Sequence, residues 1–119
     1  MTASPEILLV SKDDPVLTYT RRKVLEAAGF RTYWASSLGL AASMAVRRKM
    51  TIVILESSFS LLEQSAFVES LHESYPEIHV LCFGYEVLGP EELLSECRSI
   101  LSGQPGSARV HRFELPRAS

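Results

Sequence analysis

Three short runs of almost wholly apolar residues constrain the fold of this chain most. They are EILLVS at residues 6–11, TIVIL at 51–55 and IHVLCFG at 78–84. Each is shorter than a typical core helix and is apolar at consecutive positions, which is typical of a strand buried on both faces of a parallel sheet. Because parallel strands are joined by crossovers, a helix is expected after each run.

The sequence carries start and stop signals for those helices. Asp13 or Asp14 offers an N-cap before Pro15, and Gly29 stands where the same helix should end. Predicted strands lie at 6–11, 31–37, 51–55 and 78–84, and predicted helices at 15–28, 38–49, 60–75 and 90–101. Strands that alternate with helices in this way predict a single doubly wound α/β domain, a parallel sheet with helices on both faces.

The chain should divide into a folded domain at 1–103 and a C-terminal tail at 104–119. The tail is rich in Gly, Pro and Ser, a composition typical of a mobile segment. Within it, ARVHRFEL at 108–115 has the pattern of a strand that pairs if a sheet edge is offered. The tail is therefore expected to be mobile or to pair with an edge.

Composition and motifs exclude several classes of function. A net charge of −2 gives no field for nucleic acid or an anionic membrane, and no apolar run is long enough to span a bilayer. Cys82 and Cys97 fall in a predicted strand and helix of a chain without a leading apolar segment, which favours a reduced, cytoplasmic protein. There is no Gly-rich phosphate loop, nucleophile elbow or paired-cysteine metal motif, and His72 and His79 have no second ligand at metal spacing. The sequence thus argues against an enzyme.

Polar residues gather where the predicted strands end. Lys12, Asp13 and Asp14 follow the first strand, Glu56 follows the third and Gly84 ends the fourth. In open parallel sheets, ligands and chemistry collect at this carboxyl edge. The simpler interpretation is also open: Asp13 or Asp14 caps a helix, and Glu56 is a solvated carboxylate.

The order ILLVSKDDP, AAGF, TIVILE, IHVLCFG and GPEELLSECRSIL resembles the receiver domain of bacterial response regulators over residues 6–102. The resemblance implies a flavodoxin-like fold in which two acidic residues after strand 1 hold Mg²⁺ and an aspartate after strand 3 accepts a phosphoryl group from a histidine kinase. By position, the acidic pair falls on Lys12 and Asp13, Asp14 with Pro15 matches the usual acid and proline, and the phosphoacceptor place is Glu56.

Other parts of that pattern are altered. The family's hydroxyl residue at the end of strand 4 falls on Gly84, and its phosphate-binding lysine has no counterpart, because GPEELL follows strand 4 almost directly. The resemblance therefore implies four to five strands, with the fourth helix, or that helix and the fifth strand, missing or reduced. Such a loss should leave the edge of strand 78–84 or the last helix's apolar stripe open to a partner. That stripe consists of Leu93, Leu94, Cys97, Ile100 and Leu101.

These departures argue against phosphotransfer. Lys12 puts a fixed positive charge where a metal ligand should be, the Glu56 carboxylate lies one methylene too far, and Gly84 has no hydroxyl. No cofactor is expected, and Asp13, Asp14 and Glu56 are the remaining candidates for Mg²⁺. The hypothesis is a stand-alone degenerate receiver that binds a protein partner or a second copy of itself, with no nucleic acid or membrane involved.

Two alternatives stay open. The first is a receiver that is still phosphorylated, on Asp13 or Asp14, and the second is a small-ligand module of flavodoxin-like fold.

Trp34 and Tyr33 are relevant to where a partner would bind. They should pack between their strand and a helix, unless that strand is an exposed edge and the indole marks a surface for a partner.

Overall fold

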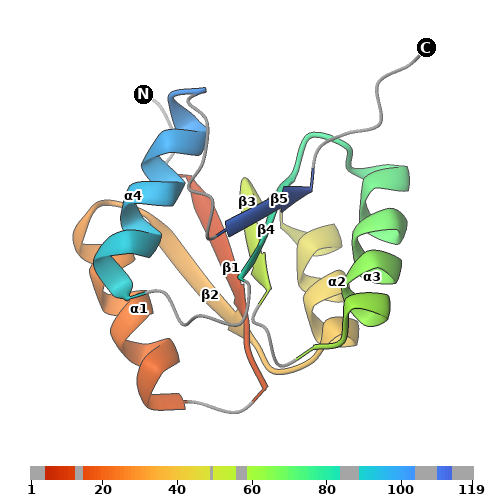
Figure 1. Ribbon diagram of the computed structural model, residues 1–119, viewed down its shortest axis with the longest axis horizontal. Coiled ribbons are helices and arrows are strands. Elements are labelled where there is room, and N and C mark those ends of the chain that lie inside the picture. Colours follow the sequence, from red (N-terminus) through yellow and green to blue (C-terminus); the bar gives the residue numbers. More distant parts are fainter. Residues whose placement is uncertain are drawn as a thin grey trace.

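The computed structural model describes residues 5–12, 15–48, 50–55, 59–83, 89–103 and 110–113, which form an α/β sandwich (Figure 1). The strands are β1 (Glu6–Val10), β2 (Arg31–Ala35), β3 (Ile52–Leu55), β4 (His79–Phe83) and β5 (Val110–Phe113). The helices are α1 (Pro15–Ala27), α2 (Leu38–Arg47), α3 (Leu61–Ser74) and α4 (Pro90–Leu101). Each predicted strand and helix is present, with ends shifted by up to two residues.

The strands form one sheet in the order β2-β1-β3-β4-β5. The first four are parallel, as the doubly wound prediction requires, with Leu8 of β1 opposite Tyr33 of β2 and Val53 of β3. β5 is antiparallel to β4, with Phe113 opposite Val80. The fifth strand therefore comes from the segment expected to be a tail, and it pairs within its own chain.

The sheet separates two hydrophobic clusters, because successive strand residues point to opposite faces. Leu8 and Val10 face α2 and α3, whereas Ile7 and Leu9 face α1 and α4. These two pairs of helices lie on opposite sides of the sheet (Figure 1). Both cysteines are free and buried, as the sequence predicts. Ser37 caps α2, because its hydroxyl accepts a 3.1 Å hydrogen bond from the Leu40 N–H. Gly29, just after α1, has φ +98°.

The expected opening at β4 and the last helix is absent from the described structure. β5 pairs along β4, and Leu93, Leu94, Cys97 and Ile100 are buried on the face that α4 shares with α1. Only Leu101 of the predicted stripe is substantially exposed, at 45%. The expectation that this region is open to a partner is wrong, because the C-terminal segment supplies a strand and α4 covers the sheet directly. Residues 85–88, where a reduced fourth helix would fall, lie outside the described residues.

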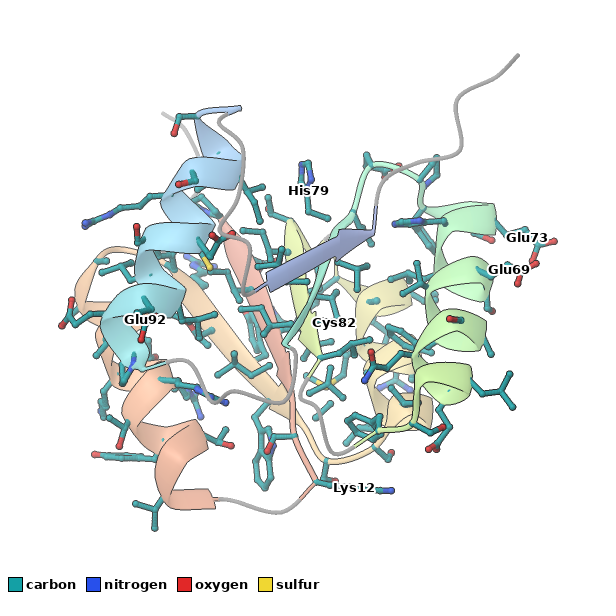
Figure 2. All side chains as sticks on the ribbon, in the orientation of Figure 1. Lys12, Glu69, Glu73, His79, Cys82 and Glu92 are labelled. Atoms are coloured by element: carbon teal, nitrogen blue, oxygen red, sulfur yellow. The ribbon has the colours of Figure 1, made fainter. Side chains whose placement is uncertain are left out.

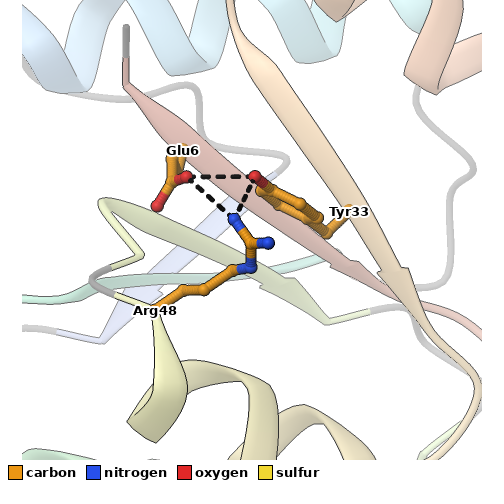
Figure 3. Close-up of polar contacts among 3 residues, drawn as sticks. All are labelled: Glu6, Tyr33 and Arg48. Carbon is orange, nitrogen blue, oxygen red and sulfur yellow. Dashed lines mark hydrogen bonds and ion pairs between the residues drawn. The ribbon is translucent and has the colours of Figure 1, made fainter. Parts of the chain in front are cut away.

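β2 is the edge strand opposite β5. Tyr33 anchors it: its hydroxyl donates to Glu6 Oε1 over 3.0 Å and accepts from Arg48 Nη1 over 2.7 Å (Figure 3). Arg48 also lies 3.6 Å from Glu6, which joins the start of β1, β2 and the end of α2. Trp34, on the other face, is 44% exposed. Tyr33 packs against the cluster under α2, as the first alternative expected, whereas the Trp34 indole is exposed on an edge strand, and its role as a partner surface stays a prediction.

Candidate functional site

The candidate site lies at the carboxyl edge of the sheet, where the chain leaves β1 and β3. Lys12 follows this end of β1, and Phe59 stands between β3 and the start of α3. Of the five residues singled out from the sequence, the structure describes Lys12. Asp13, Asp14, Glu56 and Gly84 lie outside the described residues, so their predicted roles stay predictions.

The Lys12 ammonium packs over an aromatic ring. Its Nζ atom lies 5.3 Å from the centre of the Phe59 ring, within the range of a cation–π interaction. Phe59 is buried, whereas Lys12 is exposed and extends at this edge of the molecule (Figure 2). The lysine thus links the residues that follow β1 to those that follow β3.

The start of α3 is closed by a capping box beside this contact. The Ser60 hydroxyl accepts from the Glu63 N–H, and Glu63 Oε1 accepts from the Ser60 N–H, both over 3.1 Å. The bond from the Ser60 N–H lowers the pKa of the Glu63 carboxyl, and the Ser60 hydroxyl and the charge of Lys12 act in the same direction. The sequence signal for this box, Ser-Leu-Leu-Glu at 60–63, was available and was missed.

Phe59 is also held from the helix side. The side-chain amide of Gln64 donates to the Phe59 carbonyl oxygen over 2.8 Å, and this bond is buried. A buried, satisfied hydrogen bond fixes the backbone that presents the ring. Gln64 has no sequence signal for this role, because a glutamine one turn into a helix is usually solvated.

A cluster of buried polar side chains lies beneath the end of β1. Ser11, Thr18 and Arg21 are all buried and line one narrow space together with Leu9 and Ile54. Arg21 of α1 therefore places a second positive charge beneath the end of β1. Lys12 lies on the surface at the same end. A buried arginine is uncommon, and nothing in the spacing of α1 predicts it.

The described part of the site does not fit a divalent metal. Within the described ranges, no three His, Cys, Asp or Glu residues are grouped closely enough to hold one. Lys12 occupies the first of the places that the resemblance assigns to metal-binding acids, and an ammonium only donates hydrogen bonds. Ligands for Mg²⁺ would have to come from residues 13, 14 and 56. None of the helices in these ranges is long and apolar enough to cross a membrane.

Comparison with known proteins identifies the architecture. No family model and no curated protein sequence matches the chain. A response regulator from Thermotoga maritima aligns with a TM-score of 0.72 at 18% identity, over 83% of this chain and 98% of that chain. The fold is that of a response-regulator receiver domain. Two further structures with this receiver fold agree.

The first of these is the receiver domain of NtrC4 from Aquifex aeolicus, with a TM-score of 0.59 and 15% identity over 92% of this chain and 81% of that chain. The second is the chemotaxis protein CheY4 of Vibrio cholerae, with a TM-score of 0.54 and 16% identity over 87% and 84%. These likenesses establish the receiver fold over most of the chain. They assign no role to Lys12 or Glu56, because a shared fold does not carry a shared function.

Proposed function

We propose that this chain is a degenerate receiver domain that acts by contact with another protein and not by phosphotransfer. The observation that carries the proposal is the Lys12 ammonium, held over the Phe59 ring at the end of β1. In the receiver pattern this place belongs to an acidic residue that binds the metal. A cation seated here competes with Mg²⁺ for the same carboxylates.

The chemistry of phosphotransfer supports the same proposal. A divalent ion neutralises the phosphoryl oxygens in such reactions, and Mg²⁺ demands oxygen ligands in near-octahedral geometry. Glu56 places its carboxylate one methylene further from the backbone than aspartate does, and small misplacements of a reacting group reduce rates strongly. Gly84 offers no hydroxyl to a phosphoryl oxygen. Three separate substitutions thus weaken the same reaction.

The proposal includes the partners of the chain and its cellular compartment. The chain has no catalytic activity of its own, works in the cytoplasm and binds a protein, a second copy included. A net charge of −2 gives it no attraction for nucleic acid or anionic lipid. Two buried, free cysteines are compatible with a reducing compartment.

The test is treatment of the full chain with acetyl phosphate and Mg²⁺, followed by intact-mass measurement, with a phosphorylatable receiver domain treated in parallel as the positive control. We expect no phosphoryl adduct on this chain and a clear adduct on the control. An adduct that disappears in Asp13→Asn or Asp14→Asn would overturn the proposal and identify a phosphorylated receiver.

A further inference from the structure

We propose that the face formed by α2 and α3 is a self-association surface, through which two copies of this chain pack as a symmetric dimer. The two-fold axis would run along the groove between the two helices, so that α2 of each copy lies on α3 of the other. This inference rests on the proposed function and names the protein partner as a second copy. The surface lies on the opposite side of the sheet from α4, whose apolar stripe is largely buried.

The two helices of this face run in the same direction. α2 connects β2 to β3 and α3 connects β3 to β4, and these strands are parallel to one another in the sheet. Each helix therefore runs back against its strand, and the two lie side by side over one hydrophobic cluster (Figure 1). Their last turns are level, because Val46 of α2 lines the same hollow as Ser70 and Ser74 of α3.

The two helices carry opposite charges. α2 has a single charged residue, Arg47, whereas α3 has three glutamates and no lysine or arginine. Arg48, which follows α2, is held by Glu6 and Tyr33. Arg47 and Glu73 make no ion pair among the residues that the structure describes. The face therefore presents a positive and a negative charge that are both free to pair with another molecule.

Both of these charges lie on the outer side of their helices. Arg47 comes two positions after the buried Ala45, and Glu73 comes two positions after the buried Leu71. Two positions turn a helix by about 200°, so each charged side chain starts opposite the side that faces the sheet. Both residues are exposed, and Figure 2 shows Glu73 projecting from α3 away from the sheet. A second molecule on this face would contact them both.

An apolar hollow lies between the two helices. It has a volume of about 160 Å³, and its lining includes Ala42 and Val46 from α2 and Phe67 and Tyr75 from α3. Val46 is 60% exposed, although it borders this hollow. Covering exposed apolar surface is favourable, and an apolar centre with charges around it is typical of a protein interface.

The charges select a second copy as the partner and fix the direction of its axis. A two-fold axis along the groove places Arg47 beside Glu73 of the partner subunit, because the last turns of α2 and α3 are level, and the symmetry repeats this pair. The two Val46 side chains then approach the axis, each over the partner's hollow. An axis across the helices would instead oppose the glutamates of α3 to those of the partner, which is unfavourable.

The first test is the oligomeric state of the full chain by light scattering across micromolar concentrations. We expect a dimer that weakens as salt is raised. Arg47→Glu and Glu73→Arg should each raise its dissociation constant at least about tenfold, because each turns two attractive pairs into two repulsive ones. Arg98→Glu is the matched control, since Arg98 is also exposed in the last turn of its helix, α4. A monomer at high micromolar concentration, or equal weakening by Arg98→Glu, would overturn the inference.

Mixing the two variants tests whether the pair forms between chains. In a mixed dimer, position 47 of the Arg47→Glu chain is acidic and faces position 73 of the Glu73→Arg chain, which is basic. The other contact keeps the natural Arg47 and Glu73. We therefore expect an equimolar mixture to dimerise about as tightly as the natural chain, while each variant alone stays weak. No recovery on mixing would refute the proposed pairing.

The apolar centre is tested by a substitution that leaves the charges in place. Val46→Ser should raise the dissociation constant at least about tenfold, as expected for a residue at the centre of an interface. Val16→Ser is the matched control, because Val16 is 75% exposed on α1, on the other side of the sheet. It should leave the constant unchanged. An unchanged constant for Val46→Ser would refute the placement of the axis at this groove.

These outcomes are separable from those of the phosphorylation test. A phosphorylated chain whose dimer recovers on mixing would refute the proposed mode of action and keep the interface. A monomer without a phosphoryl adduct would refute the interface and leave contact with a different protein as the function.

Discussion

The indole N–H of Trp34 donates to the carbonyl oxygen of Ser11 over 3.2 Å, which ties the edge strand β2 to the residue before Lys12. Trp34 is the only tryptophan of the chain. Its fluorescence should therefore respond to changes at the end of β1. This gives the candidate site an intrinsic reporter that needs no label.

That reporter allows a direct test of Lys12. Lys12→Asp removes the ammonium over Phe59 and restores a carboxylate beside Asp13, so we expect this variant to bind Mg²⁺ with a saturable change in Trp34 fluorescence at millimolar concentrations. The natural chain should show no saturable change. Lys12→Ala is the control, since it removes the cation without adding a ligand. Saturation by the natural chain would show that Lys12 does not exclude the metal.

Glu63 gives a prediction about pH. Its pKa is lowered from an ordinary value of 4.5, first by the Ser60 N–H, so the ionised form is favoured in the folded state. A lowered carboxyl pKa contributes stability above the unfolded-state pKa, and that contribution is lost as pH falls through the folded-state pKa. We expect the free energy of unfolding, measured in urea, to fall less in Glu63→Gln than in the natural chain when the pH is lowered from 7 to below 4.5.

The matched control is Glu69→Gln, an exposed substitution on the same helix outside the capping box. Its acid dependence should follow that of the natural chain. Equal acid sensitivity of Glu63→Gln and the natural chain would contradict the role assigned to the capping box.

Much of the fold was readable because its signals are local. Runs such as TIVIL identify buried strands, and Pro15, Gly29 and Ser37 mark helix ends by properties of single residues. The place of β5 was harder to predict, because a four-residue strand depends on an open edge at β4 more than on its own sequence. For the same reason, the apolar stripe of α4 was wrongly expected to be open to a partner.

The site was less predictable, because its contacts join residues distant in sequence. Lys12 was identified because it departs from the receiver pattern. Its contact with Phe59, however, joins residues that two helices and two strands separate in the sequence, so no local sequence rule predicts it. The burial of Arg21 likewise depends on how α1 lies on the sheet. The exposure of Trp34 could not be predicted, because it depends on whether β2 is an edge strand. Only the strand order of the sheet decides that.

The thiols offer a prediction about reactivity. Burial raises the pKa of Cys82 to about 12, so its thiol stays protonated near neutral pH, and the thiolate is the reactive form. Since Cys97 is also buried, we expect neither thiol to react with a disulfide reagent at pH 8 in the native chain and both to react in urea. Ser65→Cys, on an exposed position of α3, is the positive control. Rapid native labelling of Cys82 would contradict its place in the core.

The last prediction tests the cover of the sheet by α4. Leu81 of β4 is fully buried in the cluster that contains Leu93 and Cys97, so Leu81→Ala should destabilise the chain by about 2–5 kcal/mol. Leu62 is 82% exposed at the start of α3, and Leu62→Ala should change stability by no more than about 0.5 kcal/mol. Urea unfolding of both variants supplies the comparison. Similar small effects would mean that α4 does not pack on β4, which would reopen that face to a partner.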